Sequence, residues 1–111
     1  MKNVRVLMSD EVHKRLQARA AKLGLPTVES LLLWEAELPA PWYVASFMDA
    51  MLNFGRLAAG TKFSAKDFYG EAQWNDLKLR DRIVLGQVLA EAVDNGMLYD
   101  AVKTVNYYVK L

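Results

Sequence analysis

The sequence contains no cysteine and a single histidine, His13, among its 111 residues. A chain without cysteine has no disulfide framework, no thiol nucleophile and no thiolate zinc site. One histidine does not build a histidine-rich metal site, so we expect neither a metal nor another cofactor. No apolar run approaches the ~18–20 residues of a membrane span, and the first residues lack the order of a signal peptide. We therefore expect a cytoplasmic protein with no membrane partner.

Features of an enzyme are also scarce. Gly55, Gly60 and Gly70 are too scattered to form a glycine-rich phosphate loop. The single histidine, His13, does not belong to a recognisable Ser-His-acid catalytic triad. Asp67 and Glu71 form a possible carboxylate pair on one helix face, but Asp67 is better explained as a first-turn residue of a helix. We expect a protein that is not an enzyme.

Charged residues are balanced over the whole chain but not along it. The sequence has 14 Lys and Arg against 13 Asp and Glu, and 53% of its residues are apolar, which excludes intrinsic disorder. Residues 1–22 contain six basic and two acidic residues, a net charge of +4, whereas residues 23–50 contain four acidic residues and no basic one. The basic N-terminal stretch is therefore the first place to look for an anionic partner.

The first residues predict a strand and then a helix. Apolar residues recur at every second position over residues 3–8, which is the period of a strand. Ser9 is a suitable N-cap for a helix over residues 10–23, because the apolar positions there recur every three or four residues. Gly24 is a suitable end for that helix.

A second helix and a hinge complete this half of the chain. Thr27 is a suitable cap for a helix that runs to about Leu38. Two prolines within residues 39–41 then form a stiff extended hinge. We therefore divide the chain into residues 1–38, the hinge and residues 42–111.

The second half predicts alternating helices and short extended segments. In chain order these are a helix over residues 42–57, an extended piece at 61–63, a helix over 65–69 capped by Ser64, a helix from residue 79 or 80, a turn at Asn95-Gly96, and strand-like stretches at 97–99 and 102–109. Gly86 lies inside the long helix, where glycine costs ~1 kcal/mol. Its presence predicts that another element approaches closely there.

The strand over residues 3–8 needs a partner, because a single strand cannot satisfy its own backbone groups. Thirty-eight residues are also too few to bury a core alone, so the simplest partner is the same strand of a second copy. At this point residues 1–38 resemble the ribbon-helix-helix family of bacterial DNA-binding proteins, the group of the Arc and methionine repressors. The matching positions are Asn3-Val4-Arg5-Val6-Leu7-Met8-Ser9-Asp10-Glu11-Val12, Leu16, Ala20, Gly24 and Val28-Glu29-Ser30-Leu31-Leu32.

The resemblance implies an intertwined homodimer on double-stranded DNA, joined through residues 3–8 and the second helix. The two strands of the dimer form an antiparallel ribbon that enters the major groove. The alternation of the family directs Asn3, Arg5 and Leu7 toward the bases, where Arg5 suits guanine and Asn3 suits adenine. Leu7 is apolar where the family usually carries a polar base reader, so it either contacts thymine methyl groups or marks a ribbon covered by protein.

The resemblance also implies phosphate contacts. The family binds phosphate through the backbone amides at the start of its second helix, which here means Thr27 and Val28. Lys2 and Lys14 are expected to add contacts to the DNA backbone. Such contacts make binding steeply dependent on salt.

Two apolar residues of the second helix depart from the family pattern. Leu33 and Trp34 stand where the family usually shows polar residues to solvent. We interpret them as a surface on which the second half of the chain docks. The alternative for residues 1–38 is a plain strand-helix-helix module that serves only to dimerise.

Residues 42–111 have the element order of a winged helix-turn-helix and also resemble a small, functionally uncharacterised domain of bacterial and mobile-element proteins. The stretches that carry this resemblance are Phe63 to Gly70, Trp74, Arg80 to Gly86 and Asn106 to Lys110. In a winged helix the start of the last helix enters the major groove. A second surface for DNA would then comprise Lys78, Arg80, Arg82, Gln87, Lys103 and Asn106. Asp76 and Asp81 lie among these basic residues. The alternative is therefore a solvent-exposed face on which acidic and basic side chains form salt bridges.

The sequence therefore predicts a mainly α-helical protein with short β-strands: a ribbon-helix-helix unit followed by a winged-helix-like α/β domain. The predicted function is a homodimeric, sequence-specific DNA-binding protein, a transcriptional repressor of plasmid, phage or bacterial type. A protein-interaction module, such as a phage-encoded inhibitor built on a repressor scaffold, is the main alternative, which Leu7 and the acidic middle of the chain favour. A non-specific or single-stranded DNA binder is a third.

Overall fold

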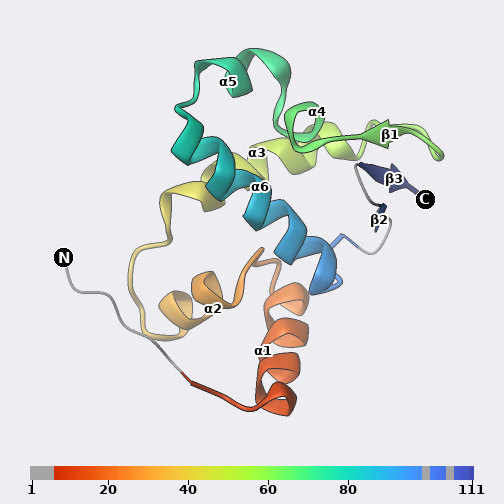
Figure 1. Ribbon diagram of the computed structural model, residues 1–111. Coiled ribbons are helices and arrows are strands. Elements are labelled where there is room, and N and C mark those ends of the chain that lie inside the picture. Colours follow the sequence, from red (N-terminus) through yellow and green to blue (C-terminus); the bar gives the residue numbers. More distant parts are fainter. Residues whose placement is uncertain (1–6, 99–100, 105–106) are drawn as a thin grey trace.

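The computed structural model describes residues 7–98, 101–104 and 107–111. Figure 1 shows two parts, a helical hairpin of α1 and α2 in the lower half of the view and a larger body of α3 to α6 with a small sheet above it. The described chain is mainly helical and carries a three-stranded antiparallel sheet, as the sequence predicts. Within the described ranges, no helix combines the length and the apolar character needed to cross a membrane.

The first helix, α1 (Asp10–Lys22), confirms the sequence prediction at both ends. The Ser9 side chain accepts a hydrogen bond from the Val12 amide at 3.2 Å and so caps the first turn. Gly24 follows the helix with a φ of +76°. A left-handed residue at this position closes the end of the helix and turns the chain toward α2.

The second helix, α2 (Val28–Glu35), begins at the expected cap but ends before residue 38. Thr27 and Ser30 form a reciprocal capping box at its start. At its end Glu37 has a φ of +58°, a conformation that L side chains rarely adopt. The helix therefore ends because Glu37 turns the chain, ahead of the two prolines that the sequence prediction relied on.

The larger body contains α3 (Trp42–Phe54), α4 (Ala65–Tyr69), α5 (Glu71–Asp76) and α6 (Leu79–Asp94). Ser64 and Asp67 form the capping box of α4, so Asp67 has the first-turn role that the sequence predicts. Gly70, with a φ of +97°, separates α4 from α5. The expected helix over residues 42–57 is three residues shorter in the structure.

The sheet consists of β1 (Lys62–Phe63), β2 (Ala101–Lys103) and β3 (Tyr108–Lys110), in the order β1-β3-β2. Both pairings are antiparallel, and Tyr108 lies opposite Phe63 on one side and Lys103 on the other. The last strand in the chain is therefore the central strand of the sheet.

The strand expected over residues 97–99 is wrong for its first two residues, which form a turn. Gly96 has a φ of +81°, and the Met97 amide donates to the Ala92 carbonyl at 3.0 Å. This arrangement closes the end of α6, so the chain is still completing the helix terminus where the β-branched pattern suggested a strand. The third residue of that stretch lies outside the described residues.

The core lies between α3, α4, α6 and the sheet. Its large buried side chains are Phe47, Phe54, Phe63, Phe68, Leu85 and Leu89. Lys110 of β3 is also buried: its Nζ donates to the Phe54 carbonyl at 3.0 Å and lies 4.4 Å from the centre of the Phe54 ring. A cation at the C-terminal end of α3 interacts favourably with the helix dipole, so the final strand is tied to α3.

Gly86 does not mark a close approach, and that prediction is wrong. A Cβ added at Gly86 would meet no atom within 4 Å outside its own helix. The residues that α6 buries, Leu85, Val88, Leu89 and Ala92, lie on another side of the helix. The structure offers no packing reason for glycine at this position.

The strand expected over residues 3–8 is described only at its end. Leu7 and Met8 lie in neither a helix nor a strand, and the Leu7 side chain is 96% exposed. Lys2, Asn3 and Arg5 lie outside the described residues. The two-chain ribbon therefore stays a prediction.

Candidate nucleic-acid interface

The α1–α2 hairpin leaves large apolar side chains in solvent. Ala20 of α1 and Leu31 of α2 are fully buried. The exposed apolar side chains of the hairpin are Val12, Leu23, Leu32 and Trp34. Trp34 is 54% exposed, so the interpretation that it docks on the second half of the chain is wrong, whereas Leu33 is half-buried.

Part of the positive charge of α1 is neutralised within the hairpin. Arg15 pairs with Glu11 at 2.7 Å, and Arg19 donates to Glu35 of α2 at 2.6 Å. Lys14 is exposed and has no acidic partner among the described residues. Lys14 is therefore available for the phosphate contact expected of it.

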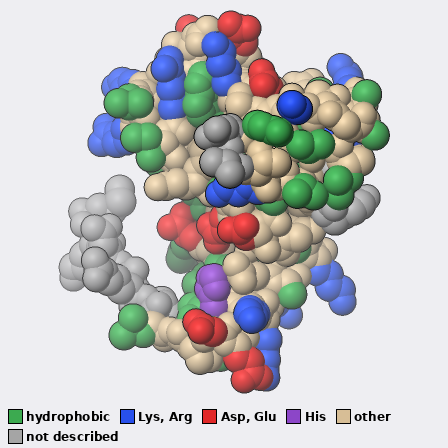
Figure 2. Space-filling model, turned by 45° about the vertical axis from the view of Figure 1, so that its right-hand side comes forward, with side chains coloured by type: hydrophobic (Ala, Val, Ile, Leu, Met, Phe, Trp, Pro, Cys, Tyr) green, Lys and Arg blue, Asp and Glu red, His purple; other side chains and the backbone are tan. Residues whose placement is uncertain are grey.

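Figure 2 shows how charge is distributed on one face of the molecule. Asp and Glu side chains gather where the upper and lower parts meet, and Lys and Arg side chains are scattered above and below them. No continuous basic stripe crosses the described residues on this face. Any DNA contact on this face would depend on separate cations rather than on a broad positive field.

The expected phosphate site at the start of α2 is covered in the single chain. Thr27 is 3% exposed and Val28 is 7% exposed. The Val28 amide, which was expected to bind phosphate, donates to the Glu91 carboxylate of α6 at 3.1 Å. A phosphate would reach this amide only by displacing that carboxylate.

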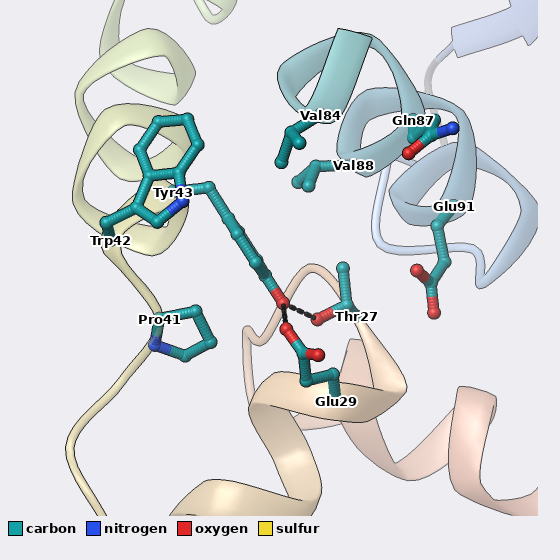
Figure 3. A pocket seen from close by; sticks show the side chains of 9 residues that line it. All are labelled: Thr27, Glu29, Pro41, Trp42, Tyr43, Val84, Gln87, Val88 and Glu91. Atoms are coloured by element: carbon teal, nitrogen blue, oxygen red, sulfur yellow. Dashed lines mark hydrogen bonds between the residues drawn. The ribbon is translucent and has the colours of Figure 1, made fainter. Parts of the chain in front are cut away.

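Tyr43 makes the main polar contact between the two parts, as Figure 3 shows. Its hydroxyl donates to the Glu29 carboxylate at 2.7 Å and lies 2.7 Å from the Thr27 hydroxyl. On the same side of the molecule the Asn95 side-chain amide donates to the Pro26 carbonyl at 3.4 Å. We call these contacts, together with the one between Val28 and Glu91, the junction.

The junction keeps Tyr43 protonated. Burial raises the pKa of the Tyr43 hydroxyl well above its ordinary value of 10.0, and the neighbouring Glu29 and Glu91 carboxylates raise it further. A protonated phenol is the form that can donate to Glu29. The hydrogen bond therefore persists through neutral pH.

Sequence reasoning did not find the junction. Tyr43 and Glu91 were not singled out, because each fits an ordinary helical pattern on its own. The signal available was weak: a buried tyrosine usually needs a hydrogen-bond partner for its hydroxyl. Nothing in the sequence names Thr27 and Glu29 as those partners.

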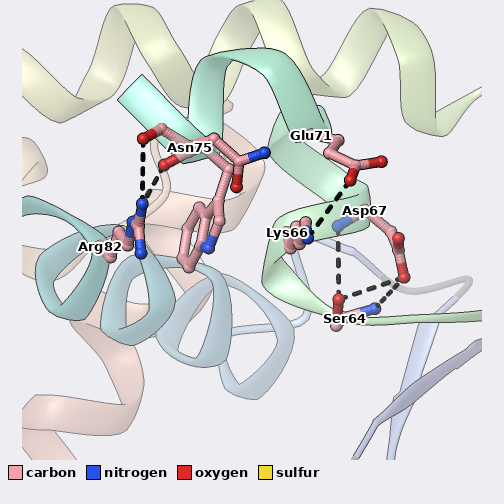
Figure 4. Close-up of polar contacts among 7 residues, drawn as sticks. Ser64, Lys66, Asp67, Glu71, Asn75 and Arg82 are labelled. Carbon is pink, nitrogen blue, oxygen red and sulfur yellow. Dashed lines mark hydrogen bonds and ion pairs between the residues drawn. The ribbon is translucent and has the colours of Figure 1, made fainter. Parts of the chain in front are cut away.

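The second expected surface is only partly free to bind DNA. Lys78, Arg80 and Gln87 are exposed along α6, and Lys103 is exposed on β2. Asn106 lies outside the described residues. Figure 4 shows that Arg82 points instead toward the end of α5, where its guanidinium donates to the carbonyls of Trp74 and Asn75 at 3.0 Å each.

The exposed side of α6 also carries apolar residues. Leu79 is 72% exposed and Ile83 is 53% exposed. They accompany Arg80 on the first two turns, the part of the helix expected to face DNA. This surface is therefore mixed in character, with apolar as well as basic side chains.

The carboxylates considered for catalysis have structural partners. Asp67 accepts hydrogen bonds from the Ser64 amide and hydroxyl at 3.0 and 3.1 Å, and Glu71 lies 3.4 Å from Lys66. In the part of the chain that the structure describes, no three His, Cys, Asp or Glu side chains are grouped to hold a metal ion.

Comparison with known proteins gives one result. Neither the curated proteins nor the solved structures contain a significant match to this chain. A family model described as a domain of unknown function, DUF1413, matches residues 49–107. The match begins within α3, includes β1, α4, α5, α6 and β2, and stops just before β3. Because it covers more than half of the sequence, the chain belongs to the DUF1413 family.

Proposed function

We propose that the protein is a homodimeric, sequence-specific DNA-binding protein that acts as a transcriptional repressor. The observation that carries the proposal is the α1–α2 hairpin, which follows a basic N-terminal segment of alternating sequence and leaves apolar side chains in solvent. A second copy of the hairpin would cover such side chains, and pairing of residues 3–8 would satisfy the backbone of both strands.

The body of the molecule supports the same proposal. Its order of helix, strand, two short helices, long helix and two strands, with the sheet order β1-β3-β2, is the arrangement expected of a winged helix. Lys78 and Arg80 then lie at the exposed start of the long helix, and Lys103 lies on the hairpin that would form the wing. Each is suited to a phosphate or base-edge contact.

The direct test is selection of binding sites from random duplex DNA with the purified full chain. Selection is run at about 50 mM and about 200 mM salt, because phosphate contacts weaken steeply over this range. We expect an enriched inverted repeat, as a two-fold symmetric dimer reads two equivalent half-sites. Enrichment of no motif, or of one without inverted symmetry, would contradict the proposal.

A matched pair of arginine variants then tests the ribbon. Arg5→Ala should weaken binding to the selected site by ~1–3 kcal/mol, because it removes a bidentate contact to guanine. Arg56→Ala, which removes an equal charge from an exposed turn after α3, should change affinity much less. Equal affinities for the Arg5→Ala variant and the parent would remove the ribbon from the mechanism.

A protein-interaction module is the second candidate, favoured by Leu79 and Ile83. These two side chains are exposed on the helix that a winged-helix protein would present to DNA, and exposed apolar groups are typical of protein contacts. This candidate predicts no duplex binding at either salt concentration. It also predicts a protein complex that the double variant Leu79→Ser, Ile83→Ser no longer forms.

A further inference from the structure

A pocket lies where the start of α2, the first residues of α3 and the middle of α6 meet (Figure 3). It is lined by Thr27, Glu29, Pro41, Trp42, Tyr43, Val84, Gln87, Val88 and Glu91. Its volume is about 390 Å³, which is within the ~300–1,000 Å³ of ordinary small-molecule sites. The space is therefore sufficient for a ligand with an aromatic ring and a polar group.

The charge of the pocket is negative. Glu29 and Glu91 contribute two carboxylates, and none of the lining residues is Lys, Arg or His. One oxygen of Glu29 accepts from Tyr43, and one oxygen of Glu91 accepts from the Val28 amide. The second oxygen of each carboxylate has no hydrogen-bond partner among the described residues, so it is available to a donor entering the pocket.

Apart from Thr27 and Gln87, the remaining lining residues are apolar or aromatic. Figure 3 shows Pro41 and Trp42 on one side and Val84 and Val88 above the pocket. The rings of Trp42 and Tyr43 meet edge to face, with centroids 6.2 Å apart and planes at 79°. Trp42 is 51% exposed, so about half of this residue is accessible. Indole and phenol faces attract cations, and the attraction is strongest where water is partly excluded.

We propose that this pocket binds a small organic cation, an ammonium, amidinium or guanidinium group carried on an apolar body about the size of one ring. The carboxylates of Glu29 and Glu91 receive the charged group, and Trp42 with the two valines receives the apolar body. A metal ion is a poorer fit, because Ca²⁺ takes 6–8 oxygen ligands and the pocket supplies two carboxylates. The inference holds whether or not the protein binds DNA.

The test uses two probes of nearly the same shape, phenylguanidine, which is a cation at neutral pH, and phenylurea, which is neutral. Each is titrated to millimolar concentration into the full chain at constant ionic strength. Binding is followed by the NMR signals of the Trp42 indole N–H and the Gln87 side-chain amide. We expect saturable shifts of both signals with phenylguanidine, and at least about tenfold weaker binding of phenylurea, since a charged hydrogen bond contributes more than a neutral one.

Two isosteric variants test the carboxylates. Glu29→Gln and Glu91→Gln each keep an oxygen that can accept the existing hydrogen bond, so the junction is preserved while one negative charge is removed. Each should weaken phenylguanidine binding by at least about fivefold. Asp76→Asn is the control, since it removes one charge from exposed α5, away from the pocket lining, and should leave binding unchanged.

The proposal is overturned by any of three results. These are no saturable shift of the Trp42 and Gln87 signals with phenylguanidine, equal affinity for phenylurea, or equal affinity for phenylguanidine in the parent and both glutamine variants. The comparison of the two probes uses the unmodified protein, so it decides the question even where a variant fails to fold.

Discussion

Tyr43 shows how a single side chain couples the two parts of the molecule. Its ring is buried beside α6, while its hydroxyl reaches Thr27 and Glu29 at the start of α2. The two glutamates near the hydroxyl also favour its protonated form. The contact between the parts is therefore sensitive to high pH.

The pH dependence of stability should report this coupling. An unfolded chain releases the Tyr43 proton near pH 10, whereas the folded chain retains it to higher pH because its pKa is raised. The stabilisation is thus complete below about pH 10 and is lost as the pH rises above it. Urea unfolding from about pH 8 to about pH 11 should show a shallower decline for Tyr43→Phe than for the parent. Burial raises the pKa of Tyr69 as well, so some decline should remain in the variant; parallel curves would contradict the role of Tyr43.

At Gly86 we predict a substitution that stabilises the protein. Alanine is favoured over glycine inside a helix by about 0.5–1 kcal/mol, and the space for a methyl group is empty here. Gly86→Ala should therefore raise the free energy of unfolding by about that amount in urea titrations. Gly24→Ala is the control and should lower it, because Gly24 has a φ of +76°. A destabilised Gly86→Ala variant would show that a contact exists at this position after all.

Some residue positions could be predicted from sequence and others could not. Ser9, Thr27 and Gly24 were identified correctly because each acts on a helix end within a few residues of itself. Glu37 could not be, since a glutamate in a left-handed conformation contradicts the usual preference for glycine. Local sequence was a sufficient guide only where a residue type commonly found at a helix end occupies that position.

At the scale of elements, α5 depends on a residue outside itself. A helix of six residues is too short to be stable alone. Arg82 of α6 donates to the carbonyls of Trp74 and Asn75 in the last turn of α5, where carbonyls lack partners within the helix. The Trp74 carbonyl also accepts from the Leu77 amide at 3.2 Å. The sequence suggested Arg82 as a DNA contact, but these bonds give it a structural role.

Substitutions of Arg80 and Arg82, both in α6, should therefore differ in their effect on stability. Arg82→Ala should lower the free energy of unfolding by about 1–3 kcal/mol, because two carbonyls lose a charged donor. Arg80 is exposed, so Arg80→Ala should change stability by less than about 0.5 kcal/mol. Thermal and urea unfolding of the two variants side by side would measure this. Equal stability of both variants would mean that water replaces Arg82 without loss.

The helices were easier to predict than the strands. Residues of α1, α3 and α6 repeat their apolar positions over several turns, which is a strong periodic signal. The strand β1 has two residues, too few to show any period, and its place is set by pairing with β3 more than forty residues later. Such pairing is decided by tertiary contacts, which the pattern of a single sequence does not reveal.

For the whole molecule, the main prediction concerns assembly. Trp34 is more than half exposed on α2, the helix through which we expect two copies to associate. Trp34→Glu should convert a dimer into a monomer, because a charge would be buried without a partner at the interface. Light scattering after size-exclusion chromatography gives the mass directly.

Leu52→Glu provides the matched control for that experiment. Leu52 is 72% exposed on α3, on the body rather than the hairpin. It should leave the dimer intact. A monomeric parent, or a dimer that persists in Trp34→Glu, would contradict association through α2.

The arrangement of the two halves was beyond sequence reasoning. Residues 39–41 lie between α2 and α3, and the break in the helices there could be predicted because proline has strong local effects. The contacts that join the halves pair residues up to sixty-nine positions apart, as with Asn95 and Pro26. No sequence motif indicates such a pair. The pocket beside the junction could therefore not be predicted from the sequence either.

The central place of β3 has a consequence for synthesis of the protein. Both other strands hydrogen-bond to residues 108–110, and neither pairs with the other. While a ribosome extends the chain, β1 emerges before β3. Its backbone groups therefore lack their pairing strand until residues 108–110 have been synthesised. Nonsense or frameshift lesions after α6 (Leu79–Asp94) and before residue 108 would thus release polypeptides that keep α1 to α6 but cannot form the sheet, which makes them substrates for cellular proteases.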